Sequence, residues 1–142
     1  MKTTIITTAV AILLSITTPV LGSNKLYKSV VGDKESGIVT TTVCKSSGNG
    51  RLTPLKQTVF YYNTDKSLKN RTSYIWDLNT KEWVVVGQHR YEYNSENKLM
   101  NVSYLCWDKT NKSWRKDAQY AMYVYDANNK HHPVKYLAVH TN

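Results

Sequence analysis

Residues 62–68 read Tyr-Asn-Thr-Asp-Lys-Ser-Leu, and residues 93–99, which lie 31 positions later, read Tyr-Asn-Ser-Glu-Asn-Lys-Leu. The tyrosine, the first asparagine and the leucine are identical in the two stretches. The same spacing of 31 residues separates Gln57, Gln88 and Gln119. A gapless period of this length is typical of a chain built from repeated supersecondary units. The sequence therefore predicts a repeat array.

Two full repeat units are present, and Trp76 and Trp83 of the first correspond to Trp107 and Trp114 of the second. A degenerate half-unit precedes them and a truncated unit follows, as expected for the capping ends of an array. The spacing rises to 32 in the last unit. We expect the extra residue to form a β-bulge somewhere in the range 119–123.

Each unit contains two runs of β-branched and aromatic residues separated by polar turn residues. The runs are Val59–Tyr62, Thr72–Trp76, Arg90–Tyr93 and Val102–Trp107, and the turns are 63–67, 77–82, 94–98 and 108–113. Asn and Asp favour such turns because their side chains accept hydrogen bonds from the turn backbone and tolerate left-handed angles, so no calcium site is inferred from them. The predicted fold is an all-β antiparallel meander of about seven strands, built from 31-residue two-strand repeats.

Strand alternation predicts a strongly aromatic face. If Tyr62 faces Leu68 and Trp76 faces Trp83, one face carries eleven rings. They are Phe60, Tyr62, Tyr74, Trp76, Trp83, Tyr91, Tyr93, Trp107, Trp114, Tyr123 and Tyr125. At ~2 kcal/mol per buried ring, leaving them all in water would forgo on the order of 20 kcal/mol, against a typical net stability of ~5 to 15 kcal/mol. We expect the sheet to curl into a sandwich-like or barrel-like form, or to pair with a second chain.

The four tryptophans are the candidate ligand-binding residues. Gly87 and Ala118 lie in mid-strand, where a bend would exchange the buried and exposed sides. With that exchange, the tryptophans would form an exposed aromatic shelf that stacks on a sugar ring or on apolar groups of a partner. Without it, they would staple their hairpins and fill the core. The sequence leaves both alternatives open.

The N-terminal residues 1–22 have the pattern of a secretory signal peptide: a lysine, an apolar stretch too short to span a bilayer comfortably, and the small-residue site Val20-Leu21-Gly22. We expect cleavage after Gly22 and a single all-β repeat domain over residues 23–142. No cysteine follows the site to carry a lipid, and no later segment resembles a transmembrane helix. The expected location is therefore secreted or periplasmic.

The formal net charge of +9 makes polyanionic partners conceivable, because a basic surface concentrates them. The lysines, however, recur at turn positions instead of forming one block, which is typical of a solvated surface. No nucleic-acid motif is present, so we expect no nucleic-acid partner. The expected partner is a glycan or a cell-surface protein, and a homodimer is the alternative.

Cys44 and Cys106 occupy the same repeat position two units apart. In an open meander they would lie four strands apart, or roughly 19 Å at ~4.8 Å per strand, whereas a disulfide needs Cα atoms within about 7 Å. Two alternatives follow: the sheet curls until its ends meet, or both residues are free thiols.

The chain offers few groups for catalysis or metal binding. It has no nucleophile elbow, phosphate-binding glycine loop or Cys/His signature, and its acids lie mostly in turns. His89, His131, His132 and His140 lack a carboxylate or thiol at metal-site spacing. We expect neither a metal nor a cofactor, and we expect no enzymatic activity.

Residues 91–99, with the pattern Tyr-x-Tyr-Asn-x-x-x-Lys-Leu, are similar to the signature of bacterial YD-repeat proteins, whose repeats are shorter. The whole mature chain, with its leader, Trp-Asp turns and 31-residue unit, more closely resembles a family of small secreted proteins of gut Bacteroidota known as domain of unknown function 3836. This resemblance implies a bacterial, periplasmic or extracellular setting and transfers no catalytic residue. Leu52 and His131 depart from the repeat pattern at the two ends.

The sequence thus favours an exported, non-enzymatic binding module for a glycan or a protein. The second alternative is a structural protein that associates with itself through a sheet edge or face. An enzyme with a site assembled from distant residues is the third.

Overall fold

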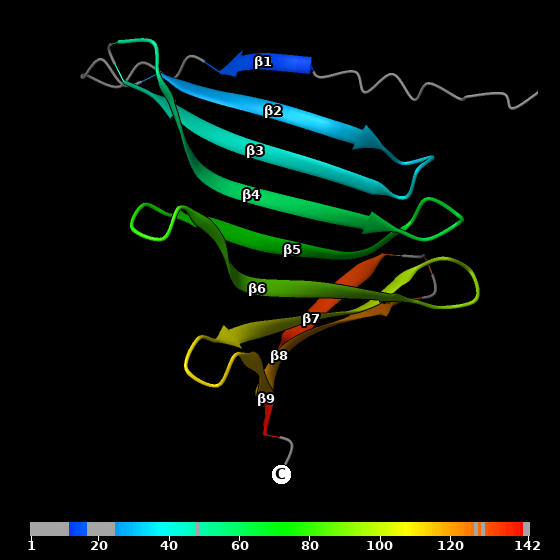
Figure 1. Cartoon of the computed structure of the whole chain (residues 1–142). Coiled ribbons are helices and arrows are strands. Elements are labelled where there is room, and N and C mark those ends of the chain that lie inside the picture. The colour runs from blue at the N-terminus through cyan, green and yellow to red at the C-terminus, as the bar shows by residue number, and fades with distance from the viewer. Residues whose placement is uncertain (1–11, 17–24, 48, 127, 129, 141–142) are drawn as a thin grey trace, which may run out of the picture.

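The computed structural model describes residues 12–16, 25–47, 49–126, 128 and 130–140, in which every regular element is a β-strand. The strands are β1 (Ile12–Ile16), β2 (Leu26–Asp33), β3 (Ile38–Ser46), β4 (Leu52–Tyr62), β5 (Leu68–Asp77), β6 (Glu82–Tyr93), β7 (Leu99–Asp108), β8 (Ser113–Tyr125) and β9 (His131–His140). They form one antiparallel sheet in chain order (Figure 1). The predicted all-β meander is confirmed.

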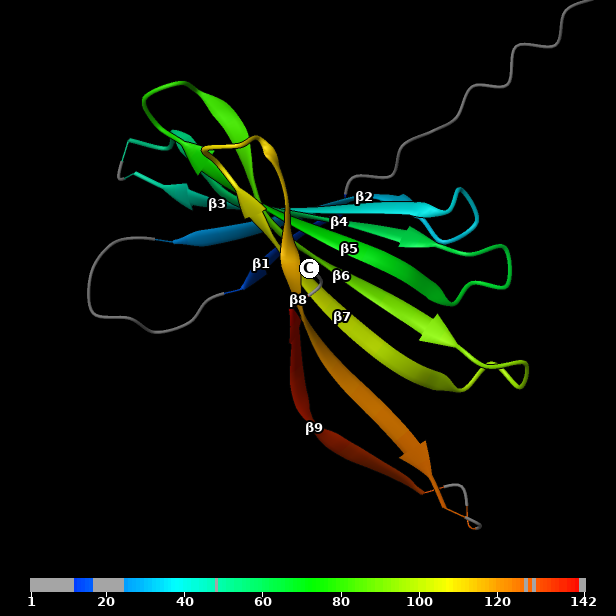
Figure 2. The same ribbon diagram turned by 90° about the horizontal axis from the view of Figure 1, so that it is seen from below.

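The sheet curls strongly but does not close. Figure 2 shows the end of β8 and the start of β9 turned far away from β2–β5, as expected for the accumulated twist of a many-stranded sheet. Each strand lies mainly against its neighbours in the chain. The expected sandwich or barrel closure is therefore absent from the described strands. Among the same residues, Ala118 is the one buried hydrophobic side chain.

The predicted signal peptide lies largely outside the described residues, as does its expected cleavage point at Gly22. The exception is β1, whose backbone pairs with β2 in the register Leu14↔Lys28. Beyond β1, the strands β2 to β9 make up the sheet of the expected mature domain. Removal of the leader stays a prediction, and it would make β2 the first edge of that sheet.

The hairpins have the expected register. Tyr62 pairs with Leu68, and Trp76 pairs with Trp83. The turn that joins β5 to β6 is held by Asp77, whose Oδ1 accepts hydrogen bonds from the backbone amides of Asn79 at 2.8 Å and Thr80 at 3.2 Å. Repeated side-chain caps of this kind explain why Asn and Asp dominate the turns.

A left-handed residue closes each of four turns: Lys66 (φ 69°), Lys81 (φ 56°), Asn97 (φ 58°) and Lys112 (φ 47°). Such angles are unfavourable for lysine, whereas asparagine tolerates them. Three of the four turns therefore place a lysine in a backbone conformation that glycine adopts more readily.

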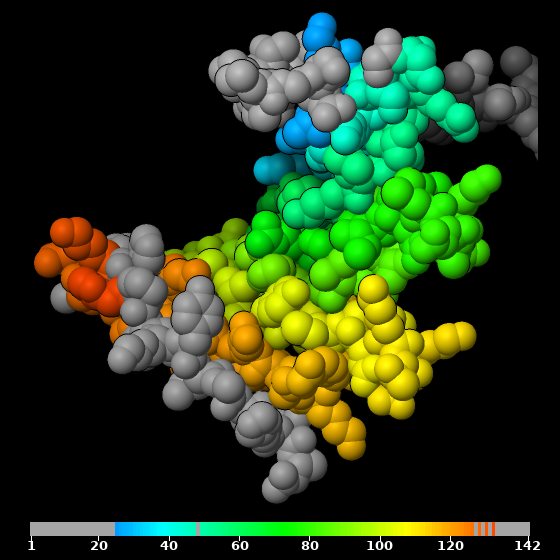
Figure 3. Space-filling view, turned by 90° about the vertical axis from the view of Figure 1, so that its left-hand side faces the viewer, coloured from blue at the N-terminus to red at the C-terminus, as the bar shows by residue number. Residues whose placement is uncertain are grey.

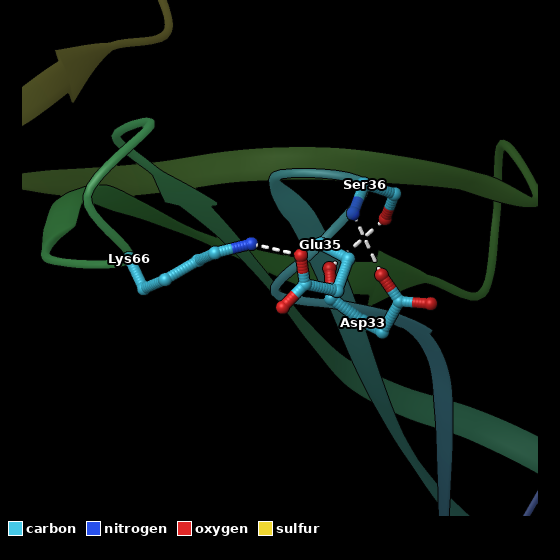
Figure 4. A network of polar contacts seen from close by, with 4 residues as sticks. All are labelled: Asp33, Glu35, Ser36 and Lys66. Atoms are coloured by element: carbon cyan, nitrogen blue, oxygen red, sulfur yellow. Dashed lines mark hydrogen bonds and ion pairs between the residues drawn. The ribbon is translucent and has the colours of Figure 1, made fainter.

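The turn that joins β2 to β3 contacts the turn that joins β4 to β5 (Figure 4). Asp33 Oδ1 accepts a hydrogen bond from the backbone amide of Ser36 at 2.7 Å, and the Ser36 hydroxyl donates to the Asp33 carbonyl at 2.9 Å. Lys66 forms an ion pair with Glu35 from the neighbouring turn. Exposed ion pairs contribute little to stability, so this contact adds little to the free energy of folding.

One-residue register shifts divide the aromatic residues between the faces. In β6 the register steps from Ser73↔Gly87 to Tyr74↔Val85, which leaves Val86 unpaired. One-residue shifts also occur at Tyr61/Tyr62 between β4 and β5 and at Glu92/Tyr93 between β6 and β7, whereas the shift between β7 and β8 is of two residues and keeps the alternation along β8. By alternation, one face carries Phe60, Tyr62, Tyr91, Tyr93, Tyr123 and Tyr125, and the other carries Tyr74, Trp76, Trp83, Trp107 and Trp114. We name them the tyrosine face and the tryptophan face.

The expectation of eleven rings on one face is therefore wrong. The exchange of faces anticipated at Gly87 takes place, whereas the one anticipated at Ala118 does not, because the register there shifts by two residues and the alternation is kept. A bulge shifts the alternation by one residue, and one shift moves every following side chain to the opposite face. Because the rings are divided between two faces, no single face has to bury all of them. This is one reason why the sheet can remain open.

The extra residue of the last unit lies earlier than expected. Between β7 and β8 the register passes from Leu105↔Ala118 to Trp107↔Trp114, so the insertion lies on β8 before Gln119. An irregularity between Tyr120 and Met122 does occur, but in the pairing of β8 with β9. In consequence Tyr120, and not Gln119, faces Ser103.

Cys44 on β3 and Cys106 on β7 are free thiols four strands apart. Of the two alternatives drawn from the sequence, the structure therefore has the free thiols. The other alternative, in which the sheet curls until its ends meet, does not occur because the sheet stays open. Burial raises the pKa of the Cys44 thiol, which therefore stays protonated at neutral pH.

Candidate binding groove on the tryptophan face

The four predicted tryptophans form two cross-strand pairs at the same end of the sheet. Ring centroids are 5.0 Å apart in Trp76–Trp83 with an interplanar angle of 70°, and 5.1 Å apart in Trp107–Trp114 with an angle of 79°. Edge-to-face contacts of this kind contribute about 0.5 to 1.5 kcal/mol each beyond burial. All four rings are half-buried. The structure thus combines the two alternatives: the indoles staple their hairpins and keep part of their surface accessible.

The sheet forks at this end. The pairing of β6 with β7 begins at Gly87↔Cys106, and the part of β6 that precedes Gly87 pairs only with β5 among the described strands. The bulge at Val86 bends β6 away at this point. The hairpins β5–β6 (green) and β7–β8 (yellow) consequently project as separate lobes, which Figure 3 shows from their tips.

A hollow of about 360 Å³ lies in this fork. It is lined by Asp77, Trp83, Val84, Val85, Trp107, Lys109 and Lys112. One indole comes from each pair, so an aromatic ring stands on either side of the hollow. The charged residues come from the two turns at its mouth.

A second hollow of about 380 Å³ adjoins the first, because Val85 lines both. It is lined by Tyr61, Asn70, Thr72, Tyr74, Val85, Gln88 and Trp114. Trp114 reaches it from β8 because the sheet curls over this face. We name the two hollows together the tryptophan groove.

Polar groups in the tryptophan groove are held in fixed positions. Gln88 Nε2 donates to Thr72 Oγ1 at 3.1 Å, and Arg90 Nε donates to Gln88 Oε1 at 2.8 Å. Asn70 Oδ1 is shielded and accepts no hydrogen bond within the described part of the chain. Burial, and then the nearby Tyr61, raise the pKa of Tyr74, so its phenol keeps its proton. The groove therefore offers both donors and acceptors beside its rings.

The comparisons with known proteins agree with this architecture. The family model for DUF3836, described as a family of unknown function, matches residues 1–127. The chain belongs to this family. The resemblance inferred from its repeats and Trp-Asp turns is confirmed.

Three crystal structures resemble this DUF3836 chain. A DUF3836 protein from Parabacteroides distasonis ATCC 8503 is 21% identical, with a TM-score of 0.53 over 69% of this chain and 88% of that one. A DUF3836 protein from Bacteroides vulgatus ATCC 8482 is 18% identical, with a TM-score of 0.47 over 73% and 87%. A protein of unknown function from Bacteroides fragilis NCTC 9343 is 13% identical, with a TM-score of 0.42 over 93% and 94%.

At these identities only the fold of the Parabacteroides distasonis protein bears on the DUF3836 chain. No curated protein matches it. Among the described residues, no helix is long and apolar enough to cross a membrane.

A third hollow on the DUF3836 chain, of about 630 Å³, contains two carboxylates. It is lined by Asp108, Asn111, Ser113, Trp114, Arg115, Lys116 and Asp117. Asp117 is bound by Arg115, through Nε at 2.8 Å and Nη2 at 3.0 Å. Hydrogen bonds from Asn111, first from its backbone amide, lower the pKa of Asp108. An acid catalyst needs a raised pKa, so the lowered pKa of Asp108 does not suit that role.

The predicted metal-ligand candidates do not converge. His132 lies 3.3 Å from Asp126, whereas His89 contacts Tyr104 on the tyrosine face. The side chains of His131 and His140 lie outside the described ones. The described residues contain no group of three or more His, Cys, Asp or Glu that could hold a metal ion.

Sequence reasoning found Trp83, Trp107 and Trp114, which line the groove or its rim. Trp76 lines none of these hollows and instead supports Trp83 edge-on. The reasoning missed Tyr61 and Asn70, because the curl that brings β8 over β4 and β5 has no local signature. The recurrence of Gln57 and Gln88 was the available signal: each donates to a threonine on the neighbouring strand.

Proposed function

We propose that this chain is an exported, non-enzymatic module that binds a neutral glycan in the tryptophan groove. The observation that carries the proposal is the placement of three indoles, two tyrosines and fixed amide groups along one groove. Sugars present apolar C–H faces and a rim of hydroxyl groups. Aromatic rings suit the faces, and side-chain amides suit the hydroxyls.

The polar side chains of the tryptophan groove favour a ligand that is rich in hydroxyl groups. The shielded Asn70 Oδ1 lacks a donor within the described residues, and an unsatisfied buried acceptor costs about 1 to 3 kcal/mol. A sugar hydroxyl that donates to this amide would recover that free energy. Lys109 and Lys112 at the mouth add hydrogen-bond donors without a matching cluster of acids.

Binding without chemistry is the simpler function for these surfaces. Asp77 is the one carboxylate that lines the groove in the described part of the protein, and its Oδ1 accepts hydrogen bonds from its own turn. Hydrolysis of a glycosidic bond ordinarily requires two carboxylates that flank the bond. A single carboxylate occupied in a turn supports a role in recognition.

The proposed location is the bacterial cell surface or the periplasm. It is supported by the leader-like residues 1–22 and by membership in a family with homologous folds in Bacteroidales. A fractionation experiment that detects the mature protein in the cytoplasm, with residues 1–22 retained, would contradict it.

The experiment is a glycan array followed by calorimetric titration of the best neutral ligand. Trp107→Ala and Trp83→Ala each remove one wall of the fork and should weaken binding by about five- to 150-fold, since stacking aromatics contribute on the order of 1 to 3 kcal/mol. Phe60→Ala is the matched control, because it removes a ring from the opposite face. If both tryptophan variants fold and bind as the parent does, the proposal fails.

A second candidate function is self-association, which the open sheet favours. Its faces carry exposed apolar side chains such as Ile75 (43% exposed), Met122 (47%) and Val124 (51%). Surfaces of this kind commonly mark contact sites. Light scattering over a concentration series would test it: a mass that remains monomeric at the highest concentration would exclude this role.

A further inference from the structure

The tyrosine face contains a hollow that the proposed function does not use. Its volume is about 380 Å³. It is lined by Arg71, His89, Tyr91, Leu99, Val102, Tyr104, Gln119, Ala121 and Tyr123. The size falls within the range of small-molecule sites. Because it lies on the opposite face from the indole pairs, its role is independent of the tryptophan groove.

A single cross-strand row forms the polar side of this hollow. Arg71 on β5 pairs with His89 on β6, His89 pairs with Tyr104 on β7, and Tyr104 pairs with Gln119 on β8. Directly paired residues point to the same face, so these four side chains stand side by side across the sheet. The row is fixed by backbone hydrogen bonds and not by flexible loops.

Short side chains leave the space beside the row. Val102 and Ala121 are paired with each other on β7 and β8, two positions along each strand from Tyr104 and Gln119. The longer rings of Tyr91 and Tyr123 flank them. The hollow thus has a small apolar floor, tyrosine walls and a polar row along one side.

Gly87 positions the ring of Tyr104. A Cβ atom at residue 87 would lie 2.6 Å from Tyr104 Oη, so the phenol ring lies directly over the glycine backbone. Its centroid is 4.6 Å from that of His89, at an interplanar angle of 40°. The glycine therefore lets the ring lie across the strand beside His89.

The hollow holds a positive charge without a negative partner. Arg71 Nε and His89 Nδ1 are shielded and have no hydrogen-bond partner within the described residues. The lining contains no carboxylate, and no ion pair of the described part includes Arg71. A partly desolvated cation without a counter-charge is unfavourable, and a bound anion would offset that cost.

The remaining groups are also donors. Burial raises the pKa of Tyr91 and of Tyr104, so both phenols keep their protons. Burial, and then the charge of Arg71, lower the pKa of His89, so the imidazole is neutral at pH 7 and Arg71 provides the single formal charge. One guanidinium among phenols matches one planar, singly charged group.

We propose that this hollow binds the carboxylate of an acidic sugar, with the Arg71 guanidinium as its charge partner and the tyrosine rings against the sugar. A carboxylate has the geometry for two parallel hydrogen bonds from a guanidinium. The rings of Tyr91 and Tyr123 offer apolar faces on which a pyranose stacks.

The test is an NMR titration of the protein with D-glucuronate, followed through the His89 ring and Arg71 Nε resonances. D-glucose and inorganic sulfate serve as comparison ligands. Glucuronate should give saturable shifts at both residues, glucose should give none, and sulfate should bind more weakly because it lacks the ring. Absence of saturable shifts with glucuronate, or equal affinity for any two of these ligands, would overturn the proposal.

Arg71→Gln should weaken glucuronate binding by about tenfold or more, in line with the loss of a charge-assisted pair. Arg51→Gln removes the same charge from an exposed loop and should leave binding unchanged. If the two variants lost glucuronate affinity equally, the ligand would be attracted by the net charge of the protein alone. That result would contradict the proposed site. If Arg71→Gln does not fold, Arg71→Lys keeps the charge, loses the guanidinium fork, and should give an intermediate loss.

The two proposals fail separately. Trp107→Ala should leave glucuronate binding intact, and Arg71→Gln should leave neutral-glycan binding intact. Loss of glucuronate binding in a folded Trp107→Ala variant would contradict the assignment to the tyrosine face.

Discussion

Gly87→Ala is the sharpest test of how the two faces are built. The new Cβ atom would lie 2.6 Å from Tyr104 Oη, 2.7 Å from Cε2 and 2.8 Å from Cζ. Carbon atoms attract at about 3.5 to 4.0 Å, so the ring would have to move by about 1 Å. The contact between Tyr104 and His89 would be disturbed by that movement.

The size of the effect follows from opposing contributions. Overpacking typically costs 1 to 3 kcal/mol, and a weakened aromatic contact lies at the lower end of that range. Alanine in a strand recovers roughly 0.5 to 1 kcal/mol of backbone entropy relative to glycine. We expect a net loss of about 1 to 2 kcal/mol in the free energy of unfolding.

Urea denaturation, followed by tryptophan fluorescence, measures this loss as a shift of the midpoint at constant slope. A double-mutant cycle with Tyr104→Ala provides the control, because that variant removes the ring that the new methyl group meets. Gly87→Ala should then be neutral or slightly stabilising. The reasoning is refuted if Gly87→Ala costs the same in both backgrounds, or if it costs nothing in the parent.

Three further predictions concern the turns, the tyrosines and the histidine. Lys112→Gly relieves a left-handed residue and should raise the free energy of unfolding by about 1 kcal/mol, whereas Lys109→Gly in the same turn should not; equal effects in denaturation would contradict this. Tyr93→Phe removes the hydrogen bond from the phenol to the Leu68 carbonyl at 3.0 Å and should cost about 1 kcal/mol, and Tyr62→Phe is the control with the same loss of a hydroxyl. Burial and Arg71 lower the pKa of His89 in the folded protein, so its contribution to stability is full above pH ~6.5 and is lost as the pH falls toward the lower folded value. Relative to His89→Gln, the parent should lose stability as the pH falls through and below ~6.5, and parallel curves would show that His89 does not contribute.

The local parts of the fold were predictable because their causes are local. Tyr62↔Leu68 and Trp76↔Trp83 follow from turns in which Asn and Asp side chains cap the backbone within a few residues. Strand type follows from the β-branched and aromatic runs. The free thiols of Cys44 and Cys106 follow from strand spacing once the sheet is open.

The distribution of rings between the faces was less accessible to sequence reasoning. It depends on β-bulges. A bulge shifts the strand register by one residue, and the sequence allows many alternative positions for such a shift. Gly87 marked one of them, whereas the recurrence of Gln119 suggested a phase that the β7–β8 register does not keep. The curl that brings Trp114 toward Tyr61 accumulates over several strands, and the row from Arg71 to Gln119 joins four strands of different units. Neither arrangement has a signature within one repeat.

The chain-order meander has a consequence for how the protein folds. Because each strand pairs with its neighbours in the sequence, contacts form between residues close in the chain, and low contact order favours fast folding. Any hairpin is able to nucleate the sheet, and the structure then spreads outward to both sides, as in a one-dimensional array. Protection against hydrogen exchange should accordingly be graded, highest in β5–β7 and decreasing toward the edge strands, in place of one all-or-none unit.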